Sequence, residues 1–314
     1  MSRRSSWVGV AERGSLAALF AIRAFYRLFG RRASVAILTP ISAYFFVTGG
    51  PIRRASMDYL RTLWGTERGR IALGKPPNWR HVFRHINAFS ENILDRMIVW
   101  GGDIDQIRIE KHGNERIDEL MRQGRGAILL SSHIGSFDML RVLSAESGMV
   151  LNVLMFTRHA VRINAFFERL QANRNLRLIR FEPGSLDAAF EMRAAIERGE
   201  FIGILGDRVW ESELERTVRV PFLGREAAFP LGPFLLQGVL GCPILYSTCV
   251  QSGPGRYRAT MREFTPAGVV PRVERAKHAE QLVQKYAAAL EEGCFETPFQ
   301  WFNFFDFWRQ TVPR

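Results

Sequence analysis

Short apolar runs alternate with amphipathic stretches from Gly124 onward, and this alternation constrains the fold more than any other feature of the chain. Apolar runs of this length, bounded by polar or glycine-containing turns, are typical of buried strands, and a 3.6-residue period is typical of helices. Their repetition predicts an α/β fold with a central, largely parallel sheet flanked by helices. The apolar runs are residues 127–130, 150–156, 176–181, 201–205 and 243–250, with one more strand-like run at 256–262, and the helical stretches are 137–147, 160–173, 185–198, 230–240 and about 275–292.

Positive charge is concentrated at the N-terminal end of the chain. The net charge is +12, and residues 1–80 hold 14 Arg or Lys against 3 acidic residues, whereas the remaining residues are nearly balanced, with 29 basic and 28 acidic. An evenly basic chain would favour general nucleic-acid binding. A basic segment mixed with long apolar runs instead indicates an anionic membrane surface, so we expect no nucleic-acid partner.

Residues 1–54 are predicted to form a membrane-associating segment in front of an α/β domain that spans residues 55–314. Residues 14–30 have the pattern of an amphipathic helix, and Ala33 to Ile52 contains no charged residue. Arginine pairs flank this uncharged stretch on both sides, which suits a helix or hairpin lying in the membrane interface. A true transmembrane span and a buried core helix remain alternatives. Residues 55–100 are expected to be helical, with a break at 74–78.

One stretch near the end of a predicted strand combines residues that could carry chemistry. Residues 127–145 read AILLSSHIGSFDMLRVLSA, in which an apolar run ends at Leu130, a loop of small residues follows, and a helix begins near Phe137. His133 and Asp138 lie on either side of that loop. A carboxylate that accepts the Nδ1–H bond of an imidazole fixes its tautomer, so that Nε2 can accept a proton as a general base. A purely structural His–Asp pair is the alternative.

The segment SSHIGSFD resembles the His-x4-Asp box of the glycerolipid and lysophospholipid acyltransferase superfamily. Later segments resemble, in order, elements of its bacterial lipid A (lauroyl/myristoyl-type) branch. The basic, apolar N-terminus also resembles the membrane anchor of this family. The likeness therefore covers nearly the whole chain. The segments are MFTR with Asn164 (155–164), GILGDR (203–208), VPFLGREAAFPLGPFLLQGVLGCPIL (220–245) and the closing TPFQWF (297–302).

This resemblance implies an O-acyltransferase that moves a fatty-acyl group from an acyl carrier protein or coenzyme A thioester to a hydroxyl or amine of a lipid acceptor. His133 would be the general base, oriented by Asp138. A lipid A-like molecule, another glycolipid or a lysophospholipid would be the acceptor, and the protein would act at the cytoplasmic face of the bacterial inner membrane. No cofactor is expected besides the thioester donor, and no metal is expected because the sequence shows no metal-site pattern. The residues implied in substrate binding are Arg158, Asn164, Asp207, Arg208 and Gly224.

Three positions depart from the usual pattern of this branch. Ser132 stands where Asn is common, Arg208 where Gln is usual, and His159 where Pro is usual. An acceptor such as an aryl-polyene or pigment lipid is therefore an alternative. A thioesterase-type hydrolase that uses the same pair on water is another, although the sequence contains no Gly-x-Ser-x-Gly motif. A non-catalytic membrane-binding protein is the third.

Overall fold

The computed structural model describes residues 16–100, 102–156, 175–181, 187–209 and 216–309. Its centre is a seven-stranded sheet with the strand order β1-β9-β8-β2-β5-β3-β4. All neighbouring strands pair in parallel except β8 and β9, which form an antiparallel hairpin. The sequence prediction of a largely parallel α/β sheet is thus confirmed. The strands are β1 (Arg108–His112), β2 (Ala127–Ser131), β3 (Leu151–Phe156), β4 (Leu176–Phe181), β5 (Phe201–Leu205), β8 (Ile244–Gly253) and β9 (Arg256–Thr265).

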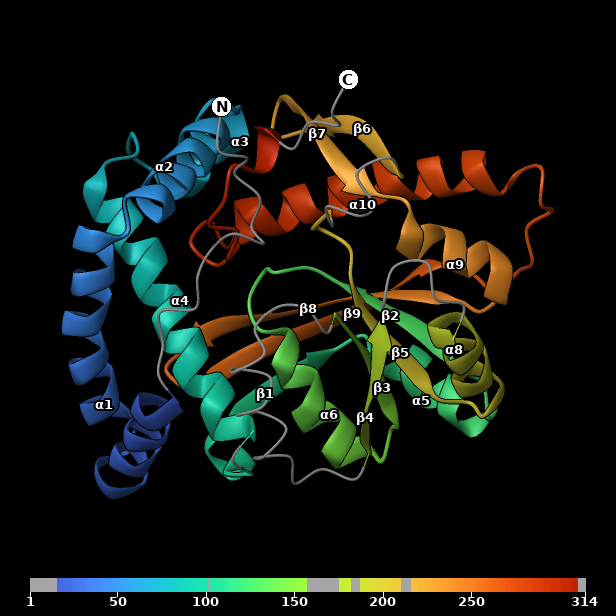
Figure 1. Cartoon of the computed structure of the whole chain (residues 1–314), viewed down its shortest axis with the longest axis horizontal. Coiled ribbons are helices and arrows are strands. Elements are labelled where there is room, and N and C mark those ends of the chain that lie inside the picture. The colour runs from blue at the N-terminus through green and yellow to red at the C-terminus, as the bar shows by residue number, and fades with distance from the viewer. Residues whose placement is uncertain (1–15, 101, 157–174, 182–186, 210–215, 310–314) are drawn as a thin grey trace.

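Each face of the sheet carries its own hydrophobic core, because successive side chains of a strand point to opposite faces. In β2, Ile128 and Leu130 belong to one core and Ala127 and Leu129 to the other. Helices cover both faces (Figure 1). The first core includes residues of α8 (Asp187–Glu197), α9 (Gly232–Leu240) and α10 (Arg275–Glu296), and the second includes residues of α5 (Glu115–Arg122) and α6 (Leu140–Ser147).

The helix α5 was not predicted from the sequence, and neither were two further features of the fold. One is the edge strand β1, whose residues are mostly exposed and charged, so that it lacks an apolar run. The other is a separate hairpin formed by β6 (Thr217–Phe222) and β7 (Arg225–Pro230). Its two-residue turn consists of Leu223 and Gly224, both with positive φ (52° and 76°), as a hairpin turn that follows the strand twist requires.

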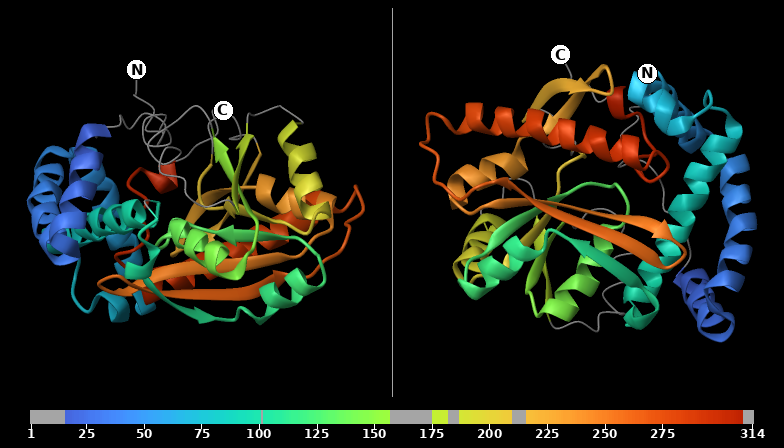
Figure 2. Two further views of the ribbon diagram at one scale, coloured as in Figure 1. Left: turned by 90° about the horizontal axis from the view of Figure 1, so that it is seen from below. Right: turned by 180° about the vertical axis from the view of Figure 1, so that it is seen from behind.

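Four helices precede the sheet and pack along one side of it, as the two views in Figure 2 show. The predicted helical region 55–100 is confirmed, and so is its break, which begins at the left-handed Gly74 (φ 68°). The predicted domain boundary after residue 54 falls inside the second of these helices. They are α1 (Leu16–Thr48), kinked at Gly30, α2 (Gly50–Trp64), α3 (Glu67–Leu73) and α4 (Trp79–Trp100).

In the described residues, no single helix is both long and apolar enough to cross a membrane. One bent pair of helices, taken together, is long and apolar enough by length and composition. It consists of Ala21–Thr48 and Gly50–Trp64, and the two helices meet at an angle of 92°.

The helix α1 has one face in the protein core and one face in solvent. Tyr26 and Leu38 are buried in the core that also includes α4. On the other side, Phe29, Tyr44 and Val47 are more than half exposed. The uncharged stretch therefore supplies core residues as well as an exposed apolar surface, and its place in a membrane interface stays a prediction.

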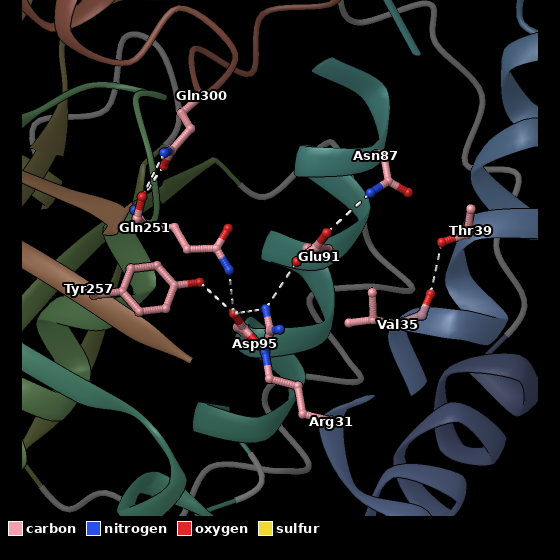
Figure 3. Close-up of polar contacts among 9 residues, drawn as sticks. All are labelled: Arg31, Val35, Thr39, Asn87, Glu91, Asp95, Gln251, Tyr257 and Gln300. Atoms are coloured by element: carbon pink, nitrogen blue, oxygen red, sulfur yellow. Dashed lines mark hydrogen bonds and ion pairs between the residues drawn. The ribbon is translucent and has the colours of Figure 1, made fainter. Parts of the chain in front are cut away.

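A buried ion pair fixes α1 to the rest of the molecule (Figure 3). Arg31 donates to both carboxylate oxygens of Asp95 in α4, at 2.9 and 3.1 Å. Asp95 is completely buried and also accepts a hydrogen bond from the hydroxyl of Tyr257 in β9 at 2.8 Å. This one carboxylate consequently connects the N-terminal helix, α4 and the sheet.

Candidate active site

The candidate site lies at the carboxyl ends of β2 and β5, which are parallel neighbours. Their register pairs Ser131 with Leu205, the last residue of each strand. His133 and Asp207 each follow two residues later. Parallel neighbouring strands end at the same edge of a sheet. Two residues that lie the same number of positions beyond a pair of matched strand residues therefore come close together, even when they are far apart in the sequence.

His133 and Asp207 form a direct hydrogen bond. The Nδ1 atom of His133 lies 2.7 Å from Oδ1 of Asp207, and the backbone N–H of His133 donates to Oδ2 at 2.9 Å. A carboxylate can only accept, so Nδ1 carries the proton in the neutral imidazole and Nε2 is the free acceptor. The His133 side chain is 22% exposed and that of Asp207 is 0% exposed. The pair therefore presents one basic nitrogen to incoming molecules and hides its carboxylate.

The prediction that Asp138 orients His133 is corrected by this geometry. Asp138 instead forms an ion pair with Arg96 of α4, whose Nε lies 3.0 Å from Oδ2. Asp138 belongs to η3 (Phe137–Met139), the short helical turn after the His133 loop. Sequence proximity suggested this residue, but register across two neighbouring strands brings Asp207 to the imidazole.

The surroundings of His133 favour its neutral form. Burial lowers the pKa of His133 most strongly, and the positive charges of Arg208 and Arg96 lower it further, while Asp207 raises it. Burial would raise the pKa of Asp207, but the charge and hydrogen bonds of His133, together with Arg208, bring it down to about 2. At neutral pH the pair thus consists of an ionised carboxylate and an imidazole able to accept a proton.

The loop that carries His133 is held tightly by its neighbours. Gly135 has a φ of +66°, and a Cβ atom there would lie 2.1 Å from the carbonyl oxygen of Cys249. Its N–H donates to the carbonyl of Gln300 at 2.8 Å, and the N–H of Phe302 donates to the carbonyl of His133 at 2.9 Å. Gly135 belongs to the loop of small residues noted in the sequence, and the close backbone of Cys249 explains why a small residue is needed there.

The closing segment also reaches Asp207 through a side chain. The indole Nε1–H of Trp301 donates to Oδ2 of Asp207 at 3.0 Å. The sequence placed this tryptophan in the closing TPFQWF element without giving it a role. Both oxygens of Asp207 therefore accept hydrogen bonds from the protein, and its predicted part in substrate binding stays a prediction.

Of the remaining predicted site residues, the structure describes two, Arg208 and Gly224. Arg208 donates to the carbonyl of Phe302 at 2.9 Å, and burial lowers its pKa to about 10. Gly224 occupies the β6–β7 turn, where its positive φ explains the glycine, and substrate binding there stays a prediction. Arg158 and Asn164 lie outside the described residues. Arg96, which the sequence analysis did not single out, sits within a helix and carries no local motif that would reveal it.

No group of three or more His, Cys, Asp or Glu side chains that could hold a metal ion occurs within the part of the chain that the structure describes. The three cysteines are buried and unpaired. The site is therefore best described by its imidazole, its carboxylate and the two neighbouring guanidinium groups.

Comparison with known proteins places this geometry in a family. No curated protein sequence matches the chain. Residues 92–310, which include His133, Asp207 and Trp301, match the family described as bacterial lipid A biosynthesis acyltransferase. The match extends over more than two thirds of the 314 residues. The chain therefore belongs to the family of bacterial lipid A biosynthesis acyltransferases, enzymes that transfer an acyl group to a lipid.

Proposed function

We propose that this protein transfers a fatty-acyl group from a thioester of acyl carrier protein or coenzyme A to a hydroxyl of a lipid A-like glycolipid, with His133 as general base and Asp207 as its orienting carboxylate. The observation that carries this proposal is the 2.7 Å contact between Nδ1 of His133 and Asp207. It leaves Nε2 basic in a side chain that is only partly exposed, which is the arrangement that general-base catalysis needs.

The chemistry follows from the pair. Nε2 of His133 takes the proton of the acceptor hydroxyl while the oxygen attacks the thioester carbonyl and forms a new C–O bond. The tetrahedral intermediate collapses, the C–S bond breaks, and the imidazolium returns the proton to the departing thiolate. Asp207 stabilises the imidazolium while the charge exists. A positioned base of this kind contributes roughly 10²–10⁴-fold to the rate.

Positive charge next to the imidazole supports the same reaction. Arg208 and Arg96 are close enough to lower the pKa of His133 through their charges. Fixed cations beside a reacting carbonyl stabilise the negative charge that develops on its oxygen, and a guanidinium also suits phosphate groups of donor or acceptor. In the same proposal, Arg158, Asn164 and Gly224 help bind substrate, and Asp138 holds Arg96 in position through their ion pair.

The N-terminal region supports a membrane location, which we propose to be the cytoplasmic face of the inner membrane. The exposed side of α1 presents Phe29, Tyr44 and Val47. An apolar helix face combined with flanking arginines suits the interface of an anionic membrane, where a lipid acceptor resides. The basic residues of the same region would also attract an acidic carrier protein as donor.

Lipid mass spectrometry tests this function directly. Cells that lack the gene are complemented with the wild-type protein, with His133→Ala or with Arg193→Ala, a control in α8 whose side chain is 70% exposed. We expect one lipid or glycolipid to lose a single acyl chain in the deletion strain, and wild type and the control to restore it while His133→Ala does not. An unchanged lipid profile in the deletion strain, under conditions in which wild type is made, would contradict lipid acylation. Restoration by His133→Ala would contradict the assigned base.

A further inference from the structure

The carboxylate of Asp207 receives a hydrogen bond from a residue outside the His133 loop. Trp301 is completely buried, and its indole Nε1–H donates to Oδ2 of Asp207 at 3.0 Å. The same oxygen accepts the backbone N–H of His133, while Oδ1 faces Nδ1 of the imidazole. The indole therefore contacts the carboxylate oxygen that the imidazole ring does not use.

The backbone of Trp301 is fixed by a buried histidine of the N-terminal helices. Nε2 of His85 in α4 lies 2.9 Å from the carbonyl oxygen of Trp301. A carbonyl only accepts, so Nε2 of His85 carries the proton and Nδ1 accepts from the hydroxyl of Ser56 in α2, at 2.9 Å. The series Ser56, His85, Trp301 and Asp207 thus connects α2 and α4 with the imidazole of His133.

The indole ring itself is clamped by aromatic neighbours. Its ring centroid lies 4.9 Å from that of Phe307, 5.0 Å from that of Tyr59 and 5.3 Å from that of Phe222, all in edge-to-face arrangements. Packing of this kind leaves a bulky ring one orientation, and that orientation directs the N–H at the carboxylate.

We propose that Trp301 is a positioning residue for acyl transfer: its indole N–H fixes the carboxylate of Asp207, which in turn fixes the imidazole of His133, and His85 holds Trp301 in place. This inference rests on the proposed function. It extends the proposed site from two residues to a series of hydrogen-bonded residues that begins in the helices in front of the sheet. Trp301 touches neither substrate nor the reacting nitrogen.

The indole bond has a predictable effect on the imidazole. A donor on Oδ2 draws negative charge toward that oxygen and away from Oδ1. Without it, the carboxylate interacts more strongly with the imidazolium and is also less firmly held. The acidic limb of the pH–rate profile should then move to higher pH, and the population of the productive imidazole orientation should fall.

The experiment compares Trp301→Phe with Trp308→Phe in the purified full-length protein, with a long-chain acyl carrier protein thioester as donor and detergent-dispersed lipid A precursor as acceptor. Trp308 is also buried and lies in the same aromatic cluster, with ring centroids 6.2 Å apart, but its Nε1 makes no hydrogen bond within the described residues. Each substitution removes an indole N–H and keeps an aromatic ring. The two variants therefore separate the hydrogen bond from packing.

For Trp301→Phe we expect kcat to fall roughly tenfold to a hundredfold, the range for loss of a hydrogen bond to a charged group, with KM little changed and the acidic limb at higher pH. Trp308→Phe should leave the kcat and pH profile near those of wild type. Equal effects of the two substitutions, or a loss in Trp301→Phe without any shift of the acidic limb, would overturn the positioning role.

Two further variants separate this inference from the proposed function. In an Asp207→Asn background, Trp301→Phe should cost much less than it does alone, because its effect passes through the carboxylate. Full additivity would contradict that route. If His133→Ala is as active as wild type, the proposed function itself fails. If His133→Ala is inactive while Trp301→Phe behaves like Trp308→Phe, only the positioning role fails.

Discussion

Two buried carboxylates, Asp95 and Asp207, connect distant parts of this protein, and their partners differ in one chemical respect. Each is completely buried, and each accepts a hydrogen bond from an aromatic side chain. The main partner of Asp95 is the guanidinium of Arg31, which stays protonated at any physiological pH. The main partner of Asp207 is an imidazole, which can be neutral or protonated and whose pKa is lowered from the usual histidine value first by burial.

This difference shows which of the two clusters is suited to chemistry. The Arg31–Asp95 pair neutralises itself permanently and holds α1 against α4, so its contribution is structural. The pair of His133 and Asp207 instead has an imidazole that can act as a base, in a side chain that is 22% exposed. Burial of a carboxylate alone does not mark a catalytic site. What distinguishes Asp207 from Asp95 is a partner that can accept and release a proton.

The largest expected effect separates the two carboxylates by activity. Asp207→Asn keeps the shape of the side chain but cannot stabilise an imidazolium, so kcat should fall by up to about 10⁴-fold. Asp95→Asn should lower stability and leave the kcat of the folded protein nearly unchanged. Steady-state kinetics and thermal unfolding of both variants check this. A similar loss of kcat in the two proteins would erase the distinction.

Removal of the cation of the structural pair should cost stability. Arg31→Met leaves Asp95 buried without its ion-pair partner, and we expect the free energy of unfolding to fall by about 3–5 kcal/mol. The matched control is Arg27→Met, since the Arg27 side chain is 55% exposed and pairs with Asp103 at the surface. Its effect should be about 0–1 kcal/mol. Urea unfolding followed by tryptophan fluorescence measures the free energy of unfolding of both variants. Equal changes in the two variants would contradict a stabilising role of the buried Arg31–Asp95 pair.

His85 should make stability dependent on pH. Burial lowers its pKa from 6.5 to about 4, although the bond to the Trp301 carbonyl opposes this. Because the unfolded chain binds this proton more readily, the stability present above pH 6.5 is lost as pH falls toward 4, by an amount on the order of 3 kcal/mol.

The measurement is the free energy of unfolding at pH 7 and pH 4 in wild type and in His85→Gln. The variant should be less stable at pH 7 and should lose less on acidification. If both proteins lose the same amount of stability between these pH values, the dependence arises elsewhere in the molecule.

The smallest expected effect concerns the acidic limb of the reaction. The pKa of His133 is lowered, first by burial and then by Arg208 and Arg96, so kcat/KM should decline only below the usual histidine value of 6.5. Replacement of the cation in Arg96→Met should move this limb to higher pH. A limb that stays in place would show that Arg96 does not influence the imidazole.

The sequence predicted most of the sheet because apolar runs are a local signal. The runs at 127–130, 176–181 and 201–205 agree with β2, β4 and β5 within a residue. The exposed, charged strand β1 has no such run, and it forms because it pairs with β9 at the edge of the sheet. The β6–β7 hairpin was missed because its turn uses Leu223, a residue that rarely adopts positive φ.

The candidate site was predicted in part, and the error is instructive. His133 was identified from its place after a predicted strand and from the family resemblance, whereas Asp207 was named only as a residue implied in substrate binding. Their contact depends on β2 and β5 being neighbours in a particular register, which no local pattern in either strand reveals. Asp138 was preferred because it is close in sequence. The hydrogen bond from Trp301 depends on a segment that lies more than 160 residues further along the chain than His133.

The most direct test of the account is the acyl-transfer rate of purified His133→Ala, measured with an acyl carrier protein thioester and a lipid A precursor beside the wild-type protein. Circular dichroism of both proteins should be the same, because the His133 side chain contributes a single partly exposed contact. The account predicts a kcat lower by roughly 10²–10⁴-fold with the fold retained. A folded His133→Ala protein that transfers the acyl group at the wild-type rate would contradict it.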